Sequence, residues 1–360
     1  MQMASIERCK DDDDGTLSSP EFGVWFQPTT APATVARWAT IAEDEGFSFV
    51  GMTDGQNIWR DVYICLTAAA LKTRHIRLGP WVTNPFTRHP TVTANSIATL
   101  DELSDGRVFL GIGIGDDSVR TIGHRMARLD ELAEIVKQIR RLLKGETVET
   151  PDGQWSLATR RGGKEIYWAC ANPRSLEYAG RFADGAIISA WLVPAMMTAA
   201  RQAVDGGASA AGREPRTVAK IFNTCVSVME NGQAAREAAR PYVARALCYA
   251  ASAQVPGWSQ EEMKRFRSQY NYYDHFSPDQ AVAKEVPEHM ITKKAVAGTP
   301  EECTELLQLV IDHAFDKIAL IPMGDVESTV RLLAKRVLPR LRFSAHDAPK
   351  GEQDGEEGRL

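Results

Sequence analysis

One feature limits the possible folds more than any other: short apolar segments alternate with longer segments whose apolar residues recur at helical spacing. We predict eight strands, at residues 22–26, 47–52, 76–83, 108–114, 165–171, 185–190, 218–228 and 317–322. Helices are expected at 32–46, 60–72, 89–103, 125–144, 173–182, 194–212, 232–251, 301–313 and 326–341. Strands that alternate with helices form parallel sheets, and eight of them favour an α/β fold, a (β/α)8 TIM barrel. An open, doubly wound sheet is the alternative.

The chain has 360 residues, more than the roughly 250 of a plain (β/α)8 barrel, so insertions are expected. Two segments lack clear periodicity: about 146–163, after the fourth barrel helix, and 255–292, before the last βα unit. A Pro151–Gly153 turn predicts a hairpin in the first insertion. We expect one barrel domain at 21–342, a disordered leader or tag at 1–20, and a disordered acidic tail at 343–360.

Charge and composition exclude several classes of function. The net charge of −5 gives no basic footprint for nucleic acid or an anionic membrane. No apolar run is long enough to span a bilayer, and the N-terminus lacks a signal-peptide core. The six cysteines are scattered without a CxxC pair, which predicts reduced thiols in a cytoplasmic protein and no zinc site.

The predicted fourth strand carries an unusual glycine pattern. Gly111, Gly113 and Gly115 alternate along it, and Asp116 and Asp117 follow where a parallel strand presents catalytic groups. Glycine weakens a strand unless something approaches its backbone closely. Either a flat ring lies against this bare backbone, or the glycines relieve crowding in a tight barrel strand. The residues alone do not decide between these two interpretations.

Residues at the predicted carboxyl ends of the strands narrow the chemistry by elimination. They include no HxH or HExxH pair and no Cys/His cluster, so no metal site is expected. They include no GxSxG motif, and the glycines of the fourth strand do not form GxGxxG. The remaining acids, glycines, amides and aromatic residues suit an organic cofactor that performs a redox step.

Several motifs together resemble the bacterial-luciferase-like superfamily of flavin and deazaflavin oxidoreductases. They are Thr53–Asp54, Leu78–Pro80, Val82–Pro85, Ala98–Ser104, Gly106–Arg107, Leu110–Gly113 and Gly115–Asp116. Within the superfamily, the chain is most similar to the coenzyme F420-dependent branch, typified by methylenetetrahydromethanopterin reductase and F420-dependent glucose-6-phosphate dehydrogenase.

This resemblance implies a cofactor at the C-terminal mouth of the barrel and a non-prolyl cis peptide bond between Trp81 and Val82. By matching motifs it also implies three catalytic residues: Asp116 as proton donor, Asp54 and Trp59. The matching cofactor-binding residues are Trp81, Val82, Thr83, Gly111, Gly113, Gly115 and, around the phosphate, Ala169, Cys170, Ala171, Asn172, Arg174 and Ser189.

One departure from the family pattern concerns Gly55, which stands where many F420-dependent members have histidine. If that histidine is the base in alcohol oxidation, this chain does not oxidise a sugar alcohol by that route. Gln56 or His275 are candidates for the same space, although His275 also suits a surface position in the second insertion. Trp25, Gln56, Trp191, Tyr272 and His275 are the candidate substrate-lining residues, and the tryptophans suit core positions equally well.

Together these observations predict an F420-dependent oxidoreductase that transfers a hydride to an electron-poor C=C, C=N or C=O of a small organic substrate. A two-component monooxygenase using reduced FMN and O₂ is the first alternative, and a non-catalytic flavin-binding barrel is the second. The anionic tail of F420 predicts a basic groove, with Arg174, Arg120 and Arg125 as candidates. We expect a homodimer and a separate flavin or F420 reductase as electron donor.

Overall fold

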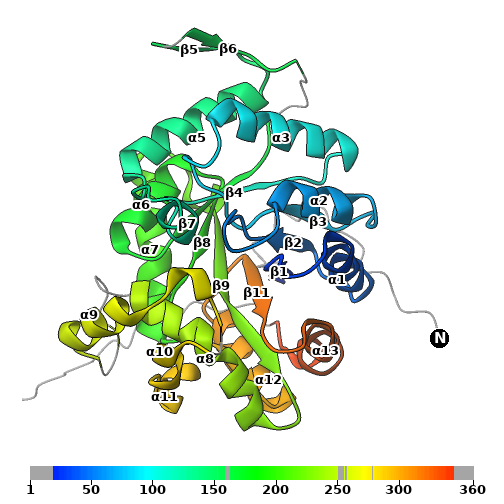
Figure 1. Ribbon diagram of the computed structural model, residues 1–360, viewed down its shortest axis with the longest axis vertical. Helices are drawn as coiled ribbons and strands as arrows, with labels where there is room; N and C mark the ends of the chain where they lie inside the picture. Colours follow the sequence, from blue (N-terminus) through cyan, green and yellow to red (C-terminus); the bar gives the residue numbers. More distant parts are fainter. Residues whose placement is uncertain are drawn as a thin grey trace, which may run out of the picture.

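The computed structural model describes residues 19–151, 153–158, 163–249, 255, 258–277 and 279–343; most of the predicted leader and tail lies outside these ranges. Eight parallel strands form the wall of a barrel (Figure 1), in the spatial order β3-β2-β1-β11-β9-β8-β7-β4. Their bounds are β1 (Glu21–Phe26), β2 (Phe49–Met52), β3 (Arg77–Pro80), β4 (Leu110–Ile112), β7 (Ile166–Cys170), β8 (Gly185–Ile188), β9 (Ala219–Val228) and β11 (Lys317–Pro322).

The two ends of this strand order, β3 and β4, meet through two isolated bridges, Leu78 with Val108 and Thr83 with Ile112. At the second bridge the Thr83 amide donates to the Gly111 carbonyl at 3.0 Å, and the Gly113 amide donates to the Thr83 carbonyl at 2.9 Å. These contacts nearly close the sheet. The predicted (β/α)8 barrel is therefore confirmed over the open sheet.

Helices cover the outside of the barrel and follow the strands in alternation (Figure 1). Proline stands in the first turn of several of them, as the sequence pattern predicts. Their bounds are α1 (Pro32–Asp44), α2 (Val62–Ala70), α3 (Pro90–Leu103), α5 (Leu129–Leu143), α6 (Pro173–Phe182), α7 (Pro194–Ala210), α8 (Gly232–Tyr249), α12 (Pro300–Ile311) and α13 (Val326–Leu332). After α13 the chain continues as a π-helical turn at Leu333–Val337 and a 3-10 turn at Leu338–Arg340.

The segments predicted as insertions contain regular structure of their own. β5 (Val148–Thr150) and β6 (Gly153–Trp155) pair antiparallel, and this predicted hairpin projects away from the barrel beyond α5 (Figure 1). The second segment was expected to be irregular but contains α9 (Gln260–Gln269), η3 (Tyr272–Asp274), α10 (Ala281–Lys284) and α11 (Glu288–Ile291). Three further elements were not predicted: α4 (Asp117–Arg120), η1 (Pro215–Thr217) and β10 (Val296–Gly298), which pairs with the carboxyl end of β9.

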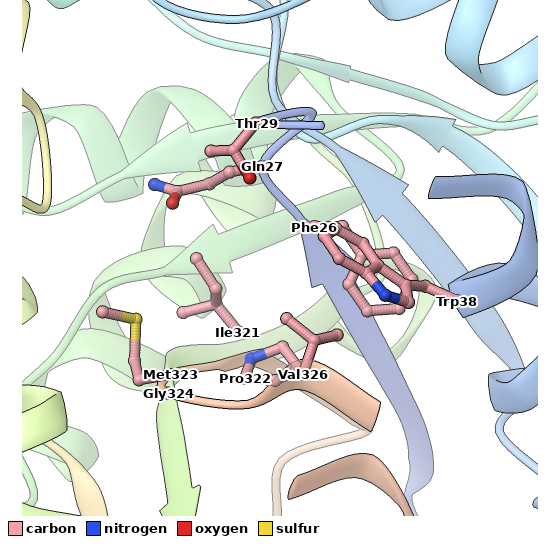
Figure 2. Close-up of a pocket in the computed structure, with 9 residues that line it drawn as sticks. All are labelled: Phe26, Gln27, Thr29, Trp38, Ile321, Pro322, Met323, Gly324 and Val326. Carbon is pink, nitrogen blue, oxygen red and sulfur yellow. The ribbon is translucent and has the colours of Figure 1, made fainter. Parts of the chain in front are cut away.

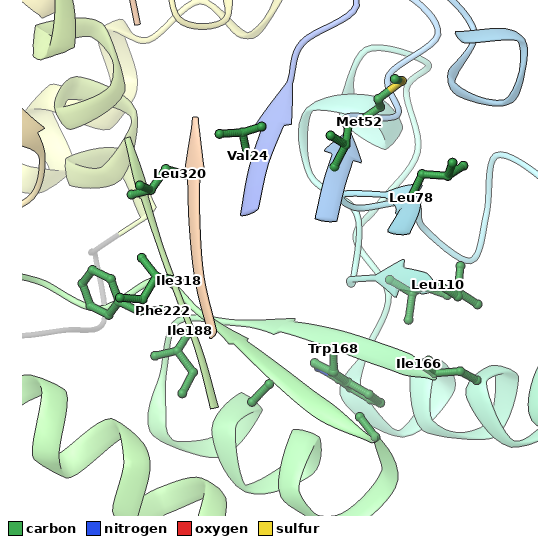
Figure 3. Packing of buried hydrophobic residues seen from close by; sticks show 14 of the residues in the cluster. Val24, Met52, Leu78, Leu110, Ile166, Trp168, Ile188, Phe222, Ile318 and Leu320 are labelled. Atoms are coloured by element: carbon green, nitrogen blue, oxygen red, sulfur yellow. The ribbon is translucent and has the colours of Figure 1, made fainter. Parts of the chain in front are cut away.

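Alternating strand residues fill two apolar layers. Val24, Leu110 and Trp168 face outward against the helices (Figure 3), whereas Trp25, Phe109 and their neighbours fill the barrel interior. The inner rings pack closely, since Phe49 and Trp81 stack with ring centroids 5.5 Å apart. No helix of the described chain is both long and apolar enough to cross a membrane. The five described cysteines are free and buried.

Candidate active site

The predicted site residues gather at the carboxyl ends of β2, β3, β4, β7 and β8. β2 pairs with β3, β3 meets β4 across the closure, and β7 and β8 follow β4 in order around the barrel. Asp54 follows β2, Thr83 follows β3, and Asp116 follows β4; Asn172 and Ser189 follow β7 and β8. The mouth of the barrel is therefore where residues separated widely in the sequence come together.

A bulge at the end of β3 supports one side of the mouth. The Trp81–Val82 peptide bond is cis, as the family resemblance implies. The Trp81 amide donates to the Met52 carbonyl at 2.6 Å, and the Trp81 indole Nε1 donates to Asn223 Oδ1 at 2.9 Å. Because its ring is 4% exposed and stacks on Phe49, Trp81 fills the barrel interior. A cofactor contact is expected to line the mouth. The Trp81 side chain lies in the barrel interior instead.

Val82 occupies the space beside the glycines of β4. A Cβ placed on Gly111 would lie 2.3 Å from the Pro80 carbonyl oxygen and 3.0 Å from Val82 Cγ1. A Cβ on Gly113 would lie 3.3 Å from both Val82 Cγ2 and the Ala169 Cβ. The glycines thus make room for the bulge. This geometry changes the expectation that a cofactor ring lies directly on the backbone at 111–113, because Val82 covers that backbone.

Gly115 has a different role, at the turn that leads from β4 into α4. Its φ of +75° lies in the left-handed region, which glycine adopts without a steric penalty. A Cβ there would also lie 2.8 Å from Val119. The turn places Asp116 and Asp117 at the start of α4, facing α8 and the 270–276 segment.

Asp54 is the centre of a buried polar network beneath the bulge. The Thr83 hydroxyl donates to Asp54 Oδ2 at 2.7 Å, and the Arg88 guanidinium forms an ion pair with the same oxygen. Arg88 also donates to Asp61 Oδ2 at 2.9 Å, and these carboxylates raise the pKa of Arg88 against the opposing effect of burial. The network holds the side chain of Thr83, the residue whose backbone bridges to Ile112 and so links β3 to β4.

Asp116 lies between two arginines. Arg120 Nε donates to Asp116 Oδ1, and Arg245 Nη2 donates to Asp116 Oδ2. Arg245 comes from α8 and its side chain is 3% exposed. Charge-assisted hydrogen bonds on both oxygens stabilise a carboxylate. Asp116 is therefore held as an anion between two cations, an arrangement that does not suit the proton donor expected at this position.

Asp117 has different surroundings, although it is the next residue. Its Oδ2 lies 3.2 Å from His275 Nδ1 and 3.4 Å from Arg245 Nη2. Burial and the neighbouring Asp116 raise the pKa of Asp117 to about 6, against the opposing charge of Arg245. Burial, with a further contribution from Arg245, lowers the pKa of His275 well below its usual value, so the imidazole is neutral.

An aromatic wall covers these acids. Trp59 packs edge-on against His275 with ring centroids 5.4 Å apart, and the Arg120 guanidinium lies 5.2 Å from the Tyr272 ring centroid. The Tyr270 hydroxyl lies 3.1 Å from His275 Nδ1. Gln56 Nε2 donates to the Ser118 carbonyl at 2.6 Å. The structure thus brings together Trp59, Gln56, Tyr272 and His275, and it buries the His275 side chain, which suited a surface position by sequence.

At the end of β7, the strand next to β4, the start of α6 forms part of the rim. Asn172 Oδ1 accepts from the Ser175 amide at 3.0 Å and caps the helix, while Ala171 and Arg174 are exposed. Cys170 does not present its thiol here, since its Sγ donates to the Ile187 carbonyl at 3.4 Å within the outer core.

The three arginines expected along a basic groove are not equally available to an anion. Arg120 pairs with Asp116, and Arg125 pairs with Glu131 at 2.7 Å. Arg174 lies at the rim with its guanidinium 5.8 Å from the Tyr178 ring centroid. Arg174 therefore stands in the segment predicted to bind the phosphate, and among the described residues no carboxylate is recorded as its ion-pair partner.

A buried lysine organises the end of β8. Lys294 Nζ donates to the Ala190 carbonyl at 2.7 Å, to Ser189 Oγ at 3.1 Å and to the Ser189 carbonyl at 3.2 Å. Burial lowers the pKa of Lys294 to about 7. Its ammonium lies 5.8 Å from the ring centroid of Trp191, which is buried beside it. Lys294 therefore holds Ser189 in place.

A hollow of about 150 Å³ lies where β1 and β11 end (Figure 2). Nearby, Trp25 Nε1 and Gln27 Nε2 are buried and have no hydrogen-bond partner within the described residues. Trp25 itself is 5% exposed and packs in the inner core. The lining residues are Phe26, Gln27, Thr29, Trp38, Ile321, Pro322, Met323, Gly324 and Val326.

Sequence reasoning missed four residues that shape the mouth: Arg88, Arg245, Tyr270 and Lys294. For Arg245 a signal exists, because it is the charged residue in an apolar stretch, 242–248, of a predicted helix. Such a residue is expected to meet a carboxylate. The other three stand in segments without periodicity or among other polar residues, so their neighbours in sequence give no comparable signal.

Fold and site define a class: a (β/α)8 enzyme whose acids, amides and aromatic residues converge at the carboxyl ends of the strands. Residues 14–316 match the family model described as luciferase-like monooxygenase, and the chain belongs to this family of oxidoreductases. The 5,10-methylenetetrahydromethanopterin reductase of Archaeoglobus fulgidus is 32% identical over 334 residues, which cover 89% of this chain and 100% of the relative.

Two further comparisons agree with this assignment. The F420-dependent glucose-6-phosphate dehydrogenase of Nakamurella multipartita is 28% identical over 335 residues, covering 86% of this chain and 93% of the relative. The solved structure of the coenzyme F420 dependent tetrahydromethanopterin reductase from Methanopyrus kandleri superposes with a TM-score of 0.76 at 24% identity, covering 90% of this chain and all of the other. The resemblance inferred from the motifs is confirmed.

Proposed function

We propose that this chain is an F420-dependent oxidoreductase that reduces an electron-poor C=C, C=N or C=O bond of a small organic substrate. The observation that carries the proposal is the end-to-end likeness to reductases and dehydrogenases of the family, several of which are named as F420-dependent. When bound, reduced deazaflavin supplies a hydride. The chain's own residues bind the ring, hold the substrate and provide the proton.

The residues at the mouth fit a flat, partly apolar ring with an anionic side chain. Val82 packs beside Gly111 and Gly113, and its methyl groups offer the ring an apolar surface. Ser189 and the exposed start of α6, with Arg174, suit a phosphate, because a helix N-terminus and a guanidinium both favour negative charge. These residues, with Thr83 and Ala169, are the ones we expect to hold the cofactor.

The direction of reaction is supported by the surroundings of Gly55. A Cβ there would lie 2.8 Å from Trp59 Cε3, so a histidine at this position does not fit while Trp59 packs against His275. Trp59 therefore fills the space that a side chain at position 55 would take, and His275 is the imidazole that stands in this wall. A cluster of buried acids beside this wall suits proton donation, which accompanies reduction.

Equilibrium binding of F420 and of FMN to the purified protein tests the proposal, followed by anaerobic turnover of the reduced cofactor. We expect F420 to bind at least tenfold more tightly than FMN, and the reduced F420 to be reoxidised by an unsaturated ketone without O₂. Tighter binding of FMN with O₂ consumption would instead support a monooxygenase. Binding of neither cofactor would support the non-catalytic barrel.

We also propose that the chain acts in the cytoplasm as a homodimer supplied by a separate F420 or flavin reductase. The support for a dimer is an exposed apolar face on two helices that pack against each other, α2 and α3. Ile64 on α2 is 62% exposed and Leu71, which caps the C-terminal end of α2, is 66% exposed; Val92 and Leu103 on α3 are 49% and 45% exposed. Large apolar side chains exposed on neighbouring helices are a feature that subunit interfaces share.

A further inference from the structure

We propose that Asp117, in contact with His275, is the residue that donates a proton to the substrate, and that Asp116 serves to position Arg245 and Arg120. This inference rests on the proposed function and names the acid of that reaction. Family motifs match Asp116 to the proton donor; the side-chain contacts of this chain favour its neighbour.

The two acids differ in the charges that surround them. Both oxygens of Asp116 accept from guanidinium groups, one from Arg120 and one from Arg245. Donation of a proton by Asp116 would require a protonated carboxyl group between two cations, which electrostatics disfavours. Asp116 therefore neutralises the arginines that enter this buried site.

Asp117 has the contacts of a proton donor. Its Oδ2 lies 3.2 Å from Nδ1 of the neutral His275 ring, and Arg245 Nη2 lies 3.4 Å from the same oxygen. Its other oxygen, Oδ1, is buried and accepts no hydrogen bond from the residues that the structure describes. Solvent and hydrogen-bond donors stabilise the ionised form of this carboxyl group only weakly. Burial therefore favours its protonated form.

The groups that face Asp117 come from three parts of the chain. Arg245 and Cys248 belong to α8, Tyr270 and His275 to the second insertion, and Asp116 and Arg120 to the β4–α4 turn. Asp116 and burial favour the protonated form of Asp117, and the two arginines oppose it. The burial effect is the largest of these, so the pKa of Asp117 rises to about 6.

In the proposed step, the bound reduced deazaflavin would supply a hydride to the carbon of the polarised double bond. The O–H bond of Asp117 would break as its proton adds to the other atom of that double bond. The cofactor is oxidised by two electrons and the substrate is reduced. Asp117 is left as a carboxylate, whose charge Arg245 stabilises, and it regains a proton from water before the next turnover.

A spectroscopic experiment tests the assignment without cofactor or substrate. Infrared difference spectra of the free protein between about pH 5 and 8 report the C=O stretch of protonated carboxyl groups. We expect a band that disappears with a midpoint near 6, is absent in Asp117→Asn and persists in Asp116→Asn. A band that persists in Asp117→Asn and disappears in Asp116→Asn overturns the proposal.

Turnover of reduced F420 with cyclohex-2-enone as the probe gives the second readout. Asp117→Asn should lower kcat at least 100-fold and change the Kd for F420 less than threefold, while Asp117→Glu restores part of kcat. Asp116→Asn should lower kcat less than tenfold. The opposite order of the two asparagine variants refutes the assignment. Failure of wild-type protein to bind F420 refutes the proposed function and leaves the infrared result standing.

Discussion

Replacing Gly111 by alanine tests the role that the structure gives to the glycines of β4. The added Cβ would lie 2.3 Å from the Pro80 carbonyl oxygen, whereas real Cβ atoms essentially never come closer than 3.0 Å. The two groups must therefore separate by at least 0.7 Å. The obstacle is a backbone oxygen, so no side-chain rotation relieves the clash.

Any movement of Pro80 disturbs the bulge. Pro80 pairs with Met52 in the sheet, and the next amide, of Trp81, donates to the Met52 carbonyl at 2.6 Å. Overpacking of this kind costs about 1–3 kcal/mol, and a weakened backbone hydrogen bond adds about 1 kcal/mol. We therefore expect Gly111→Ala to lower the free energy of unfolding by about 2–4 kcal/mol.

Gly206→Ala is the matched control. Gly206 lies on the exposed face of α7, and a Cβ there meets nothing within 4 Å. Alanine stabilises a helix by about 0.5–1 kcal/mol relative to glycine, so this variant should be slightly more stable than wild type.

Urea unfolding of both variants, together with F420 affinity, provides the assay. Gly111→Ala should shift the unfolding midpoint to lower urea and weaken cofactor binding, because Val82 moves with the bulge; Gly206→Ala should leave binding unchanged. If Gly111→Ala unfolds at the same midpoint as Gly206→Ala and binds F420 equally well, the close approach of β3 to β4 does not have the importance that we assign to it.

The remaining predictions concern buried charges and the helical face. In Lys294, burial lowers the pKa from 10.5 to about 7; between these values the unfolded chain binds more protons, so stability rises with pH. Between pH 7 and about 8.5, the free energy of unfolding of Lys294→Met should rise by about 1–2 kcal/mol less than that of wild type. Parallel curves of unfolding free energy against pH for the two proteins would contradict this. Asp54→Asn should cost about 1–3 kcal/mol because Arg88 stays charged, whereas Glu327→Gln, in an exposed ion pair, should change the unfolding free energy by less than about 0.5 kcal/mol. If the proposed dimer forms, Leu71→Glu should convert it to a monomer in sedimentation experiments, and a dimer mass unchanged by the substitution would exclude the C-terminal end of α2 from the interface.

Sequence periodicity alone predicted all eight barrel strands and the helices between them, within a few residues at each end. The prediction succeeds because apolar spacing and the proline and glycine signals at element ends are local properties of the chain. It failed for α4 and for the helices of the second insertion, which are short or mostly polar and gain their stability from contacts with α8. The family motifs located the cis Trp81–Val82 bond and the acids after β4.

Only the tertiary structure decided the state of those acids. Asp116 meets Arg245 across 129 positions of sequence, and Lys294 meets Ser189 across 105. The two aspartates are neighbours with identical side chains, yet one lies between guanidinium groups and the other faces a neutral imidazole. Proton affinity depends on solvent exclusion and on charges within a few ångströms. Closure of the barrel and packing of α8 and the second insertion over its mouth determine both.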